Sequence, residues 1–437
     1  MSMNKLFLYI LAGCLSLAAC SDDPAVTSGA DTDVPGTLPD DSDNNPETTP
    51  TGYADPDGVL LLSSGTYTVE NAFLTYIAPD GTVKNQVYAT ANSTDLGNDG
   101  VALYLCDGKQ YILCNDWRTA EGKNNNGLLT IADAETLQKE ESFDRSTMVF
   151  QHPVNEGELE EVDENMNGIA VLDERNIFIF AQGVLRFDST TGKLTLIKGA
   201  YDIGNAGTAN TVESIASSKG AMVVNGHLYA ATGGFWSGTG LLEFSKDKDE
   251  VSRRLDLNKG SLVSGMCLMD DGTLVVGTYT RGRDIGYLSF IDLENWEVKE
   301  QKTINANIGP GGNTNSGITY LNGYIYFTGA EETEFTSASY TTLSRYSIET
   351  GRVEKDVVNF KDDEPTANLL DCNIVADPGK GYIYVATSKE LWEGLIPESN
   401  ILVYDCNGET PTLVNKISGV THYVTGIYPI SMFTEKE

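Results

Sequence analysis

The chain has 437 residues, of which 40% are hydrophobic and 21% charged, so it has enough apolar material for a sizeable core and is not disordered throughout. Its 63 acidic residues outnumber 29 lysines and arginines and give a formal net charge of −34 at pH 7. Because such a charge repels phosphates, we expect no nucleic-acid partner, and an anionic ligand would need a local group of basic side chains.

Residues 1–19 predict a secretory signal peptide. Lys5 precedes an apolar run from Leu6 to Leu17 that is too short to span a membrane as a helix. The run ends at Leu17 to Cys20, which resembles a bacterial lipobox and implies cleavage before Cys20 and a lipid on its sulfur. The acidic stretch Ser21 to Asp23 resembles the surface-export signal of Bacteroidetes lipoproteins, although an acidic linker could begin in the same way.

The segment from residue 20 to residue 57 is rich in Asp, Thr, Pro and Gly and contains no Lys or Arg. It has no apolar periodicity and cannot bury a core, so it predicts a lipidated, disordered tether. Folding is expected to begin near Gly58.

From Gly58 onward, one unit of four short strands recurs. Between Gly168 and Lys198, polar turns separate four apolar runs at 169–172, 177–180, 184–187 and 194–197. The 44 glycines and only 14 prolines suit many short strands joined by tight turns. The unit therefore predicts a four-stranded antiparallel sheet.

The turns of this unit repeat at roughly 45 to 65 residues, the range of propeller blades. Turns between first and second strands are expected at Asp107-Gly108, Asn225-Gly226, Asp271-Gly272, Asn322-Gly323 and Pro378-Gly379. Turns between third and fourth strands are expected at Asp80-Gly81, Asp292 to Asn295, Thr350-Gly351 and Asn407-Gly408. Asn-Gly and Asp-Gly between apolar runs are strong hairpin signals.

Six complete blades fit between about Gly100 and Ser418. The remaining expected strands are Val59–Ser63, Ala72–Ile77 and Thr82–Tyr88 near one end and Tyr428–Phe433 at the other. Pairing the two ends in one blade would close the ring and remove two exposed edges. The sequence thus predicts an all-β, seven-bladed β-propeller over residues 58–437, with eight blades as the nearest alternative count.

In this topology, second-to-third loops and connections between blades share one face. These loops carry basic and aromatic residues, and arginine is rarely buried unpaired. The candidate ligand-binding residues are Trp117, Arg118, Lys123, Phe235, Trp236, Tyr279, Arg281, Arg283 and Trp392. Aromatic packing between blades is the alternative role for the aromatic members. The acidic connection from Gln151 to Asn167 predicts either a solvated loop or a contact with a basic protein.

Signals for catalysis are weak. The histidines His152, His227 and His422 are scattered, and the sequence has no His-Glu-x-x-His, Gly-x-Ser-x-Gly or phosphate-loop motif. No Cys-x-x-Cys or zinc spacing occurs among the cysteines. We therefore predict a protein that is not an enzyme, with no catalytic residues, no metal site and no intrinsic cofactor.

From its lipobox at Cys20 to its closing strand, the chain resembles the Bacteroidetes surface lipoproteins of the domain-of-unknown-function class 4374. The resemblance implies a lipid-anchored protein on the extracellular side of the outer membrane. It also implies capture of a ferric siderophore, such as ferric enterobactin, for a TonB-dependent transporter. Iron would be present only within the bound siderophore. No short motif assigns the role of a residue in that family to an individual residue of this chain.

Two other classes of function remain open. Trp117, Trp236 and Trp392 could be sugar platforms of a glycan-binding lipoprotein. A propeller-type hydrolase or lyase would normally need a His or carboxylate metal site, which the sequence does not indicate. Glutamates near Glu331 would repel a siderophore trianion unless they point away from it.

Overall fold

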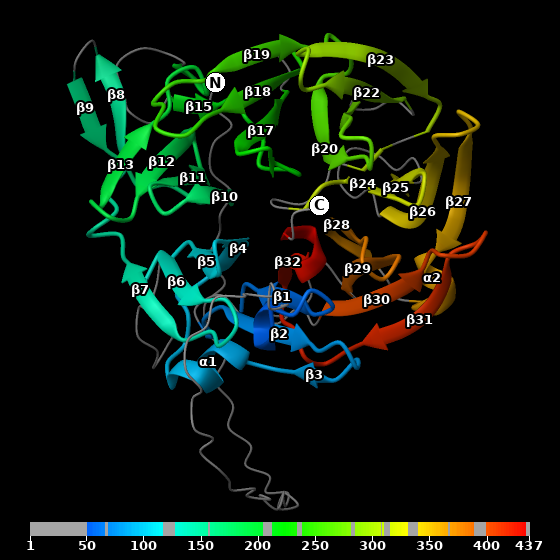
Figure 1. The fold of residues 1–437 in the computed structure, drawn as a ribbon, viewed down its shortest axis with the longest axis horizontal. Coiled ribbons are helices and arrows are strands. Elements are labelled where there is room, and N and C mark those ends of the chain that lie inside the picture. Colours follow the sequence, from blue (N-terminus) through cyan, green and yellow to red (C-terminus); the bar gives the residue numbers. More distant parts are fainter. Residues whose placement is uncertain are drawn as a thin grey trace, which may run out of the picture. The chain divides into compact units, whose positions relative to one another are not determined.

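The computed structural model describes residues 50–65, 69–116, 127–155, 158–203, 212–233, 238–280, 285–306, 308–309, 315–330, 340–365, 368–388 and 399–433. Within them, seven four-stranded antiparallel sheets stand around a common centre as the blades of a β-propeller (Figure 1). The predicted fold class and blade number are confirmed.

Blade one combines the two ends of the chain. From the inside outward its strands are β32 (Val424–Pro429), β1 (Val59–Ser63), β2 (Phe73–Ile77) and β3 (Val83–Lys84). All five residues of β1 are buried, and its ladder to β32 pairs Val59 with Pro429 and Leu61 with Ile427. The predicted closure by pairing of the N- and C-terminal strands is therefore confirmed.

The other six blades follow in chain order, each with its first strand innermost. Blades two and three are β4 (Gly100–Cys106), β5 (Lys109–Cys114), β6 (Leu129–Asp133) and β7 (Lys139–Phe143), then β10 (Gly168–Asp173), β11 (Asn176–Phe180), β12 (Val184–Asp188) and β13 (Lys193–Leu196). Blades four and five are β16 (Met222–Val224), β17 (His227–Thr232), β18 (Gly240–Phe244) and β19 (Arg253–Asp256), then β20 (Leu262–Leu268), β21 (Leu274–Tyr279), β22 (Gly286–Asp292) and β23 (Glu297–Ile304). Blades six and seven are β24 (Ile318–Leu321), β25 (Tyr324–Ala330), β26 (Tyr340–Ser347) and β27 (Val353–Asn359), then β28 (Asn368–Asp377), β29 (Tyr382–Ser388), β30 (Ser399–Asp405) and β31 (Thr412–Ile417).

Short elements outside the blades lie mainly in the connections between them. They are the hairpins β8 (Gln151–Asn155) with β9 (Glu158–Glu161) and β14 (Tyr201–Ile203) with β15 (Val212–Ser214), the helices α1 (Val87–Asn92) and α2 (Phe360–Asp363), and the 3-10 turns η1 (Gly52–Ala54) and η3 (Ile430–Phe433). No helix in the described part of the chain is long and apolar enough to cross a membrane.

The first-to-second turns explain the regularity of the blades. At Asp107-Gly108 both residues have positive φ, 49° and 71°, and Asn225-Gly226 and Asn322-Gly323 behave alike. Such turns match the right-handed twist of the strands they join, and Asn, Asp and Gly are the residues that adopt them at low cost. The turn dipeptides therefore set the hairpins locally, as the sequence predicted.

Two predicted strand boundaries in blade one are wrong. The expected strand Thr82–Tyr88 ends at Lys84, because Gln86 has φ 50° and the chain then enters α1. The expected strand Tyr428–Phe433 is shifted, since β32 ends at Pro429 and residues 430–433 form η3. Proline has no N–H to donate to a further ladder bond. The apolar side chains beyond it pack in a turn, where the Phe433 ring meets Tyr104 at 5.1 Å between centroids.

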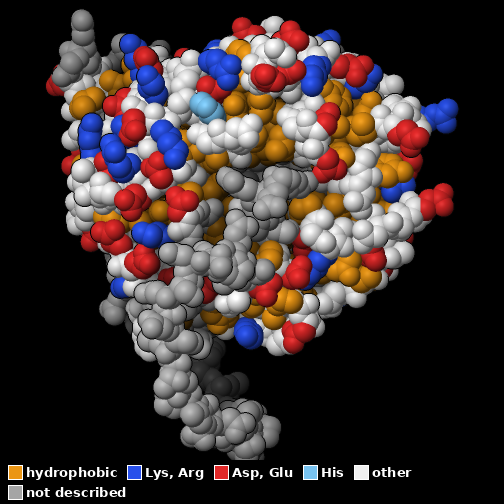
Figure 2. Space-filling view, in the orientation of Figure 1, with side chains coloured by type: hydrophobic (Ala, Val, Ile, Leu, Met, Phe, Trp, Pro, Cys, Tyr) orange, Lys and Arg blue, Asp and Glu red, His pale blue; other side chains and the backbone are white. Residues whose placement is uncertain are grey.

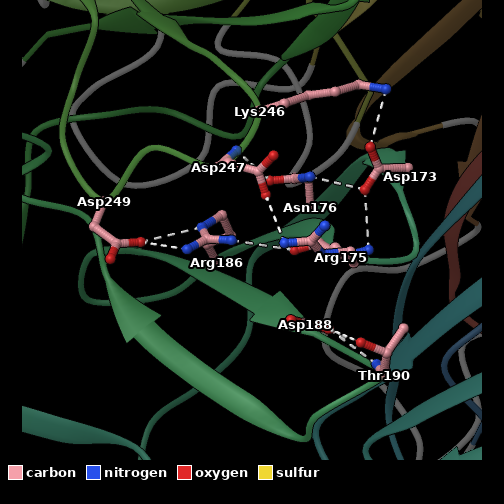
Figure 3. A network of polar contacts seen from close by, with 9 residues as sticks. All are labelled: Asp173, Arg175, Asn176, Arg186, Asp188, Thr190, Lys246, Asp247 and Asp249. Carbon is pink, nitrogen blue, oxygen red and sulfur yellow. Dashed lines mark hydrogen bonds and ion pairs between the residues drawn. The ribbon is translucent and has the colours of Figure 1, made fainter.

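Blades three and four are joined by polar contacts at the turns outside the core (Figure 3). Three ion pairs cross between them: Arg175–Asp247, Arg186–Asp249 and Lys246–Asp173. The backbone N–H of Asp247 also donates to Asn176 Oδ1 at 2.8 Å. Over this sector, Figure 2 shows lysines and arginines interspersed with carboxylates. These cations are neutralised within the fold, so they do not form a basic patch for an anionic ligand.

Candidate functional site

The strand order defines one face of the propeller on which loops converge. Neighbouring strands are antiparallel, so the start of each innermost strand and the end of each second strand lie on the same side. We call this side the inter-blade face; it includes the starts of β4, β10 and β32 and the ends of β5, β17, β21 and β29.

Of the sequence-predicted ligand-binding residues, only Tyr279 lies within the described residues. It is the half-buried last residue of β21, and its carbonyl accepts from the N–H of Ser261 at 2.9 Å. The others, Trp117, Arg118, Lys123, Phe235, Trp236, Arg281, Arg283 and Trp392, lie outside the described residues, as does Cys20. In the sequence, these eight follow β5, β17, β21 and β29, whose ends are on the inter-blade face.

A cavity of about 110 Å³ opens at this face between the innermost strands of blades one, two and three. Its lining residues come from the start of β4, the end of β5, the approach to β10 and the start of β32. They are Asp99, Gly100, Val101, Asn115, Met166, Tyr423 and Thr425. Three strands that are distant in the sequence therefore build one small polar site.

Two Asn-Asp dipeptides form one corner of this cavity. The N–H of Asn115 donates to the carbonyl of Asp99 at 2.8 Å, and the N–H of Asp116 donates to that of Asn98 at 2.9 Å. Asp99 has φ 58° and Asp116 has φ 51°, a left-handed conformation that Asp and Asn tolerate better than most residues. Left-handed residues other than glycine are often found at functional sites. Sequence reasoning missed this corner, although the paired dipeptides flanking the β4–β5 hairpin were its signal.

The carboxylate of Asp99 is held by two neutral donors. Ser64 Oγ donates to Oδ1 at 2.6 Å, and Asn115 Nδ2 donates to Oδ2 at 2.7 Å. Asn115 is itself fixed, because its Oδ1 accepts from the N–H of Met166 at 2.7 Å. The acid and the amide are thus oriented before any ligand arrives.

Asp116 is the more deeply buried of the two aspartates in this corner. It is 5% exposed, and its Oδ1 has no hydrogen-bond partner. Burial raises the pKa of its carboxyl above the usual 3.8, while the N–H of Asn98 and the charge of Arg145 offset part of that rise. Because the folded protein holds this proton more tightly than the unfolded chain does, ionised Asp116 lowers stability at neutral pH.

We therefore expect Asp116→Asn to raise the thermal melting midpoint at pH 7. Asparagine tolerates the left-handed backbone and carries no charge to desolvate. The gain should shrink as the pH falls through the raised pKa and disappear below the usual 3.8, where both states protonate Asp116. Thermal melting of the parent and of Asp116→Asn across this pH range measures the difference in midpoint. A difference that does not change with pH would contradict the role of the Asp116 charge.

The connection from blade two to blade three is anchored by a buried acid and base. His152 Nε2 pairs with Glu164 Oε1, and both side chains are fully buried. Glu164 Oε2 accepts from the N–H of Gln182 at 2.7 Å. Arg145 donates to the carbonyls of Asn115 and Glu164 at 2.9 and 2.8 Å. The acidic connection from Gln151 to Asn167 is therefore anchored by the His152–Glu164 pair. The strand β9 within it is exposed along its length.

The other histidines also lie beside carboxylates. His422 Nδ1 is 2.7 Å from Glu70 Oε2, and its ring packs edge-on against Phe73. His227 Nδ1 is 3.5 Å from Glu243 Oε1 and 3.2 Å from Ser245 Oγ. Among the described residues, no group of three or more His, Cys, Asp or Glu is placed to hold a metal ion.

The geometry defines a seven-bladed β-propeller with a small polar cavity at the inter-blade face. A family model described as "Domain of unknown function (DUF5074)" matches residues 57–428, and the chain belongs to this family. The match is to this family and not to class 4374, the family that we expected from the sequence. None of the curated proteins matches the chain.

The chain is similar to solved structures from Bacteroides species. A quinonprotein alcohol dehydrogenase-like protein from Bacteroides thetaiotaomicron superposes with a TM-score of 0.56 at 15% identity, over 85% of this chain and 78% of that one. A putative 6-phosphogluconolactonase from Bacteroides uniformis has a TM-score of 0.49 at 15% identity, over 85% of this chain and 99% of that one. At this level of identity, the first similarity shows the fold alone.

Proposed function

We propose that this protein is a lipid-anchored surface lipoprotein that binds a ferric siderophore of the catecholate type and delivers it to a TonB-dependent outer-membrane transporter. One observation carries the proposal. The strand ends that precede the basic and aromatic segments of the sequence all lie on the inter-blade face, around the innermost strands. Residues from blades two, four, five and seven can therefore contribute to one ligand site.

The chemistry of the ligand supports this assignment. A ferric tris-catecholate already satisfies its iron with six oxygens, so the protein supplies no metal ligands. Its aromatic, trianionic surface calls for arginine or lysine to oppose charge and for aromatic rings to stack. Arg118, Lys123, Arg281 and Arg283 are of this kind. Trp117 directly precedes Arg118, and Trp236 and Trp392 follow β17 and β29 in the sequence. No enzymatic step is proposed.

Replacing Arg281 and Arg283 together by alanine should weaken binding of ferric enterobactin by about ten- to several-hundred-fold. Each desolvated cation–aromatic or cation–anion contact is worth roughly 1 to 2 kcal/mol. The loss should shrink as salt is raised, because salt screens the charges. Titration of the purified protein, followed by tryptophan fluorescence at two salt concentrations, measures both effects.

The matched control is Arg175→Ala with Arg352→Ala, which changes the net charge equally. Both residues are exposed in turns away from the inter-blade face. The control should leave the affinity nearly unchanged. If the Arg281/Arg283 variant binds as tightly as the parent, the siderophore site is wrong. Tight oligosaccharide binding without a response to ferric enterobactin would assign the protein to the glycan-binding class.

Anchoring has a separate test. Cys20→Ser should abolish acylation and cleavage by the lipoprotein peptidase, because the lipid is attached to the cysteine sulfur. Incorporation of labelled fatty acid into the protein measures this, and labelling of the serine variant would overturn the lipobox interpretation. Replacing Asp22 and Asp23 by asparagine should lower protease accessibility on intact cells while leaving the lipid in place.

A further inference from the structure

The cavity between β4, β10 and β32 has properties that the siderophore proposal does not use. It contains a carboxylate, Asp99, whose hydrogen bonds in the described structure are all to neutral groups. A carboxylate has about four lone-pair positions, and the side chains of Ser64 and Asn115 occupy two of them. Both oxygens therefore keep capacity to accept from a ligand.

The charge of Asp99 is not balanced by an ion pair among the described residues. Arg145 lies at the same corner, but it donates to the carbonyls of Asn115 and Glu164. The surroundings add negative charge. Burial raises the pKa of the Cys114 thiol, and the nearby carboxylates of Asp116 and Asp99 raise it further. A neutral hydroxyl could satisfy the hydrogen bonds here, but only a cation also offsets the charge.

The size of the cavity limits the group that it can take. A volume of about 110 Å³ corresponds to about three to four waters, or to a group of three or four non-hydrogen atoms. Val101 and Met166 are the aliphatic residues among those that line the cavity. A nitrogen with several N–H donors on a short aliphatic chain would match both the polar and the aliphatic residues that line the cavity.

We propose that this cavity binds the primary ammonium group of a ligand, with Asp99 as the counter-ion and Asn115 as the residue that orients it. The ammonium donates to the free lone pairs of Asp99, and its adjacent carbons contact Met166 and Val101. This proposal does not depend on the siderophore proposal.

The test uses ethylammonium chloride as the probe and the Met166 methyl group as the reporter. The chain has eight methionines, so labelling of their methyl groups gives a simple spectrum, and Met166→Leu assigns the resonance of the cavity. We expect a saturable shift of Met166 with ethylammonium. Ethanol, which is similar in size but neutral, and sodium chloride at equal ionic strength should give no saturable shift. The ligands are compared on the parent protein, and the Met166→Leu variant serves only to assign the resonance.

Asp99→Asn should weaken ethylammonium binding about ten-fold or more, because it removes the charge alone. Asparagine accepts the left-handed backbone and can keep both hydrogen bonds, since the Ser64 hydroxyl can accept as well as donate. Asp80→Asn is the matched control. It makes the same charge change in an exposed turn of blade one, where Asp80 accepts from the N–H of Thr82 at 2.8 Å.

The outcomes are distinct. Equal shifts with ethanol and ethylammonium, no saturation, or equal losses in the Asp99 and Asp80 variants would overturn the ammonium site. Ferric enterobactin titration of Asp99→Asn separates the two proposals. We expect it to bind siderophore like the parent, whereas the Arg281/Arg283 variant should bind ethylammonium like the parent. The failure of one proposed site therefore does not overturn the other.

Discussion

Ending the chain after Gly426 is expected to abolish cooperative folding of the propeller. The deletion removes Ile427 and Tyr428, which are buried, and the ladder partners of Val59, Leu60 and Leu61 in β1. The hydroxyl oxygen of Tyr428 also accepts from the backbone N–H of Leu103 in blade two at 3.0 Å. Half of the innermost strand of blade one and part of the packing between two blades are lost together.

The expected result is a protein that aggregates or melts without a sharp transition, since an unpaired apolar strand edge recruits other chains. Size-exclusion chromatography and thermal melting by circular dichroism measure it. A control chain that ends after Phe433 keeps β32 and η3 and should behave like the parent. A monomer with an unchanged melting curve after the longer deletion would show that the ring does not need this closure.

Glu164→Ala is expected to lower the free energy of unfolding by about 3 to 5 kcal/mol, the usual cost of breaking a buried ion pair. The substitution leaves the buried His152 without its carboxylate, and the N–H of Gln182 loses its acceptor. The same change at an exposed pair provides the matched control. Lys109 and Glu140 are 34% and 43% exposed and 3.3 Å apart, so Glu140→Ala should cost less than about 1 kcal/mol.

Urea unfolding of four proteins completes this test: the parent, His152→Ala, Glu164→Ala and the double variant. The double variant should lose less than the sum of the two single losses, because the second substitution removes a group that the first left unpaired. If Glu164→Ala costs no more than Glu140→Ala, the pair does not anchor the connection between blades two and three.

The architecture was predictable because its signals are local. Asp107-Gly108, Asn225-Gly226 and Asn322-Gly323 specify hairpins through the backbone angles of two residues each. Counting such hairpins gave six blades, and the unpaired strands at both ends required a seventh. Boundaries were less predictable, because an apolar stretch such as residues 430–433 can pack equally well as a strand or as a short turn.

The sequence by itself determined the propeller, its closure and the segments in which basic and aromatic residues stand. Tertiary structure alone decided the cavity. A two-residue turn at Asp107-Gly108 would place residue 99 opposite residue 116, but a bulge near Val101 shifts the pairing so that Asn115 faces Asp99. Met166 and Tyr423 then reach the same cavity from blades three and one. A bulge and the meeting of three innermost strands depend on contacts around the closed ring, which no local pattern in the sequence encodes.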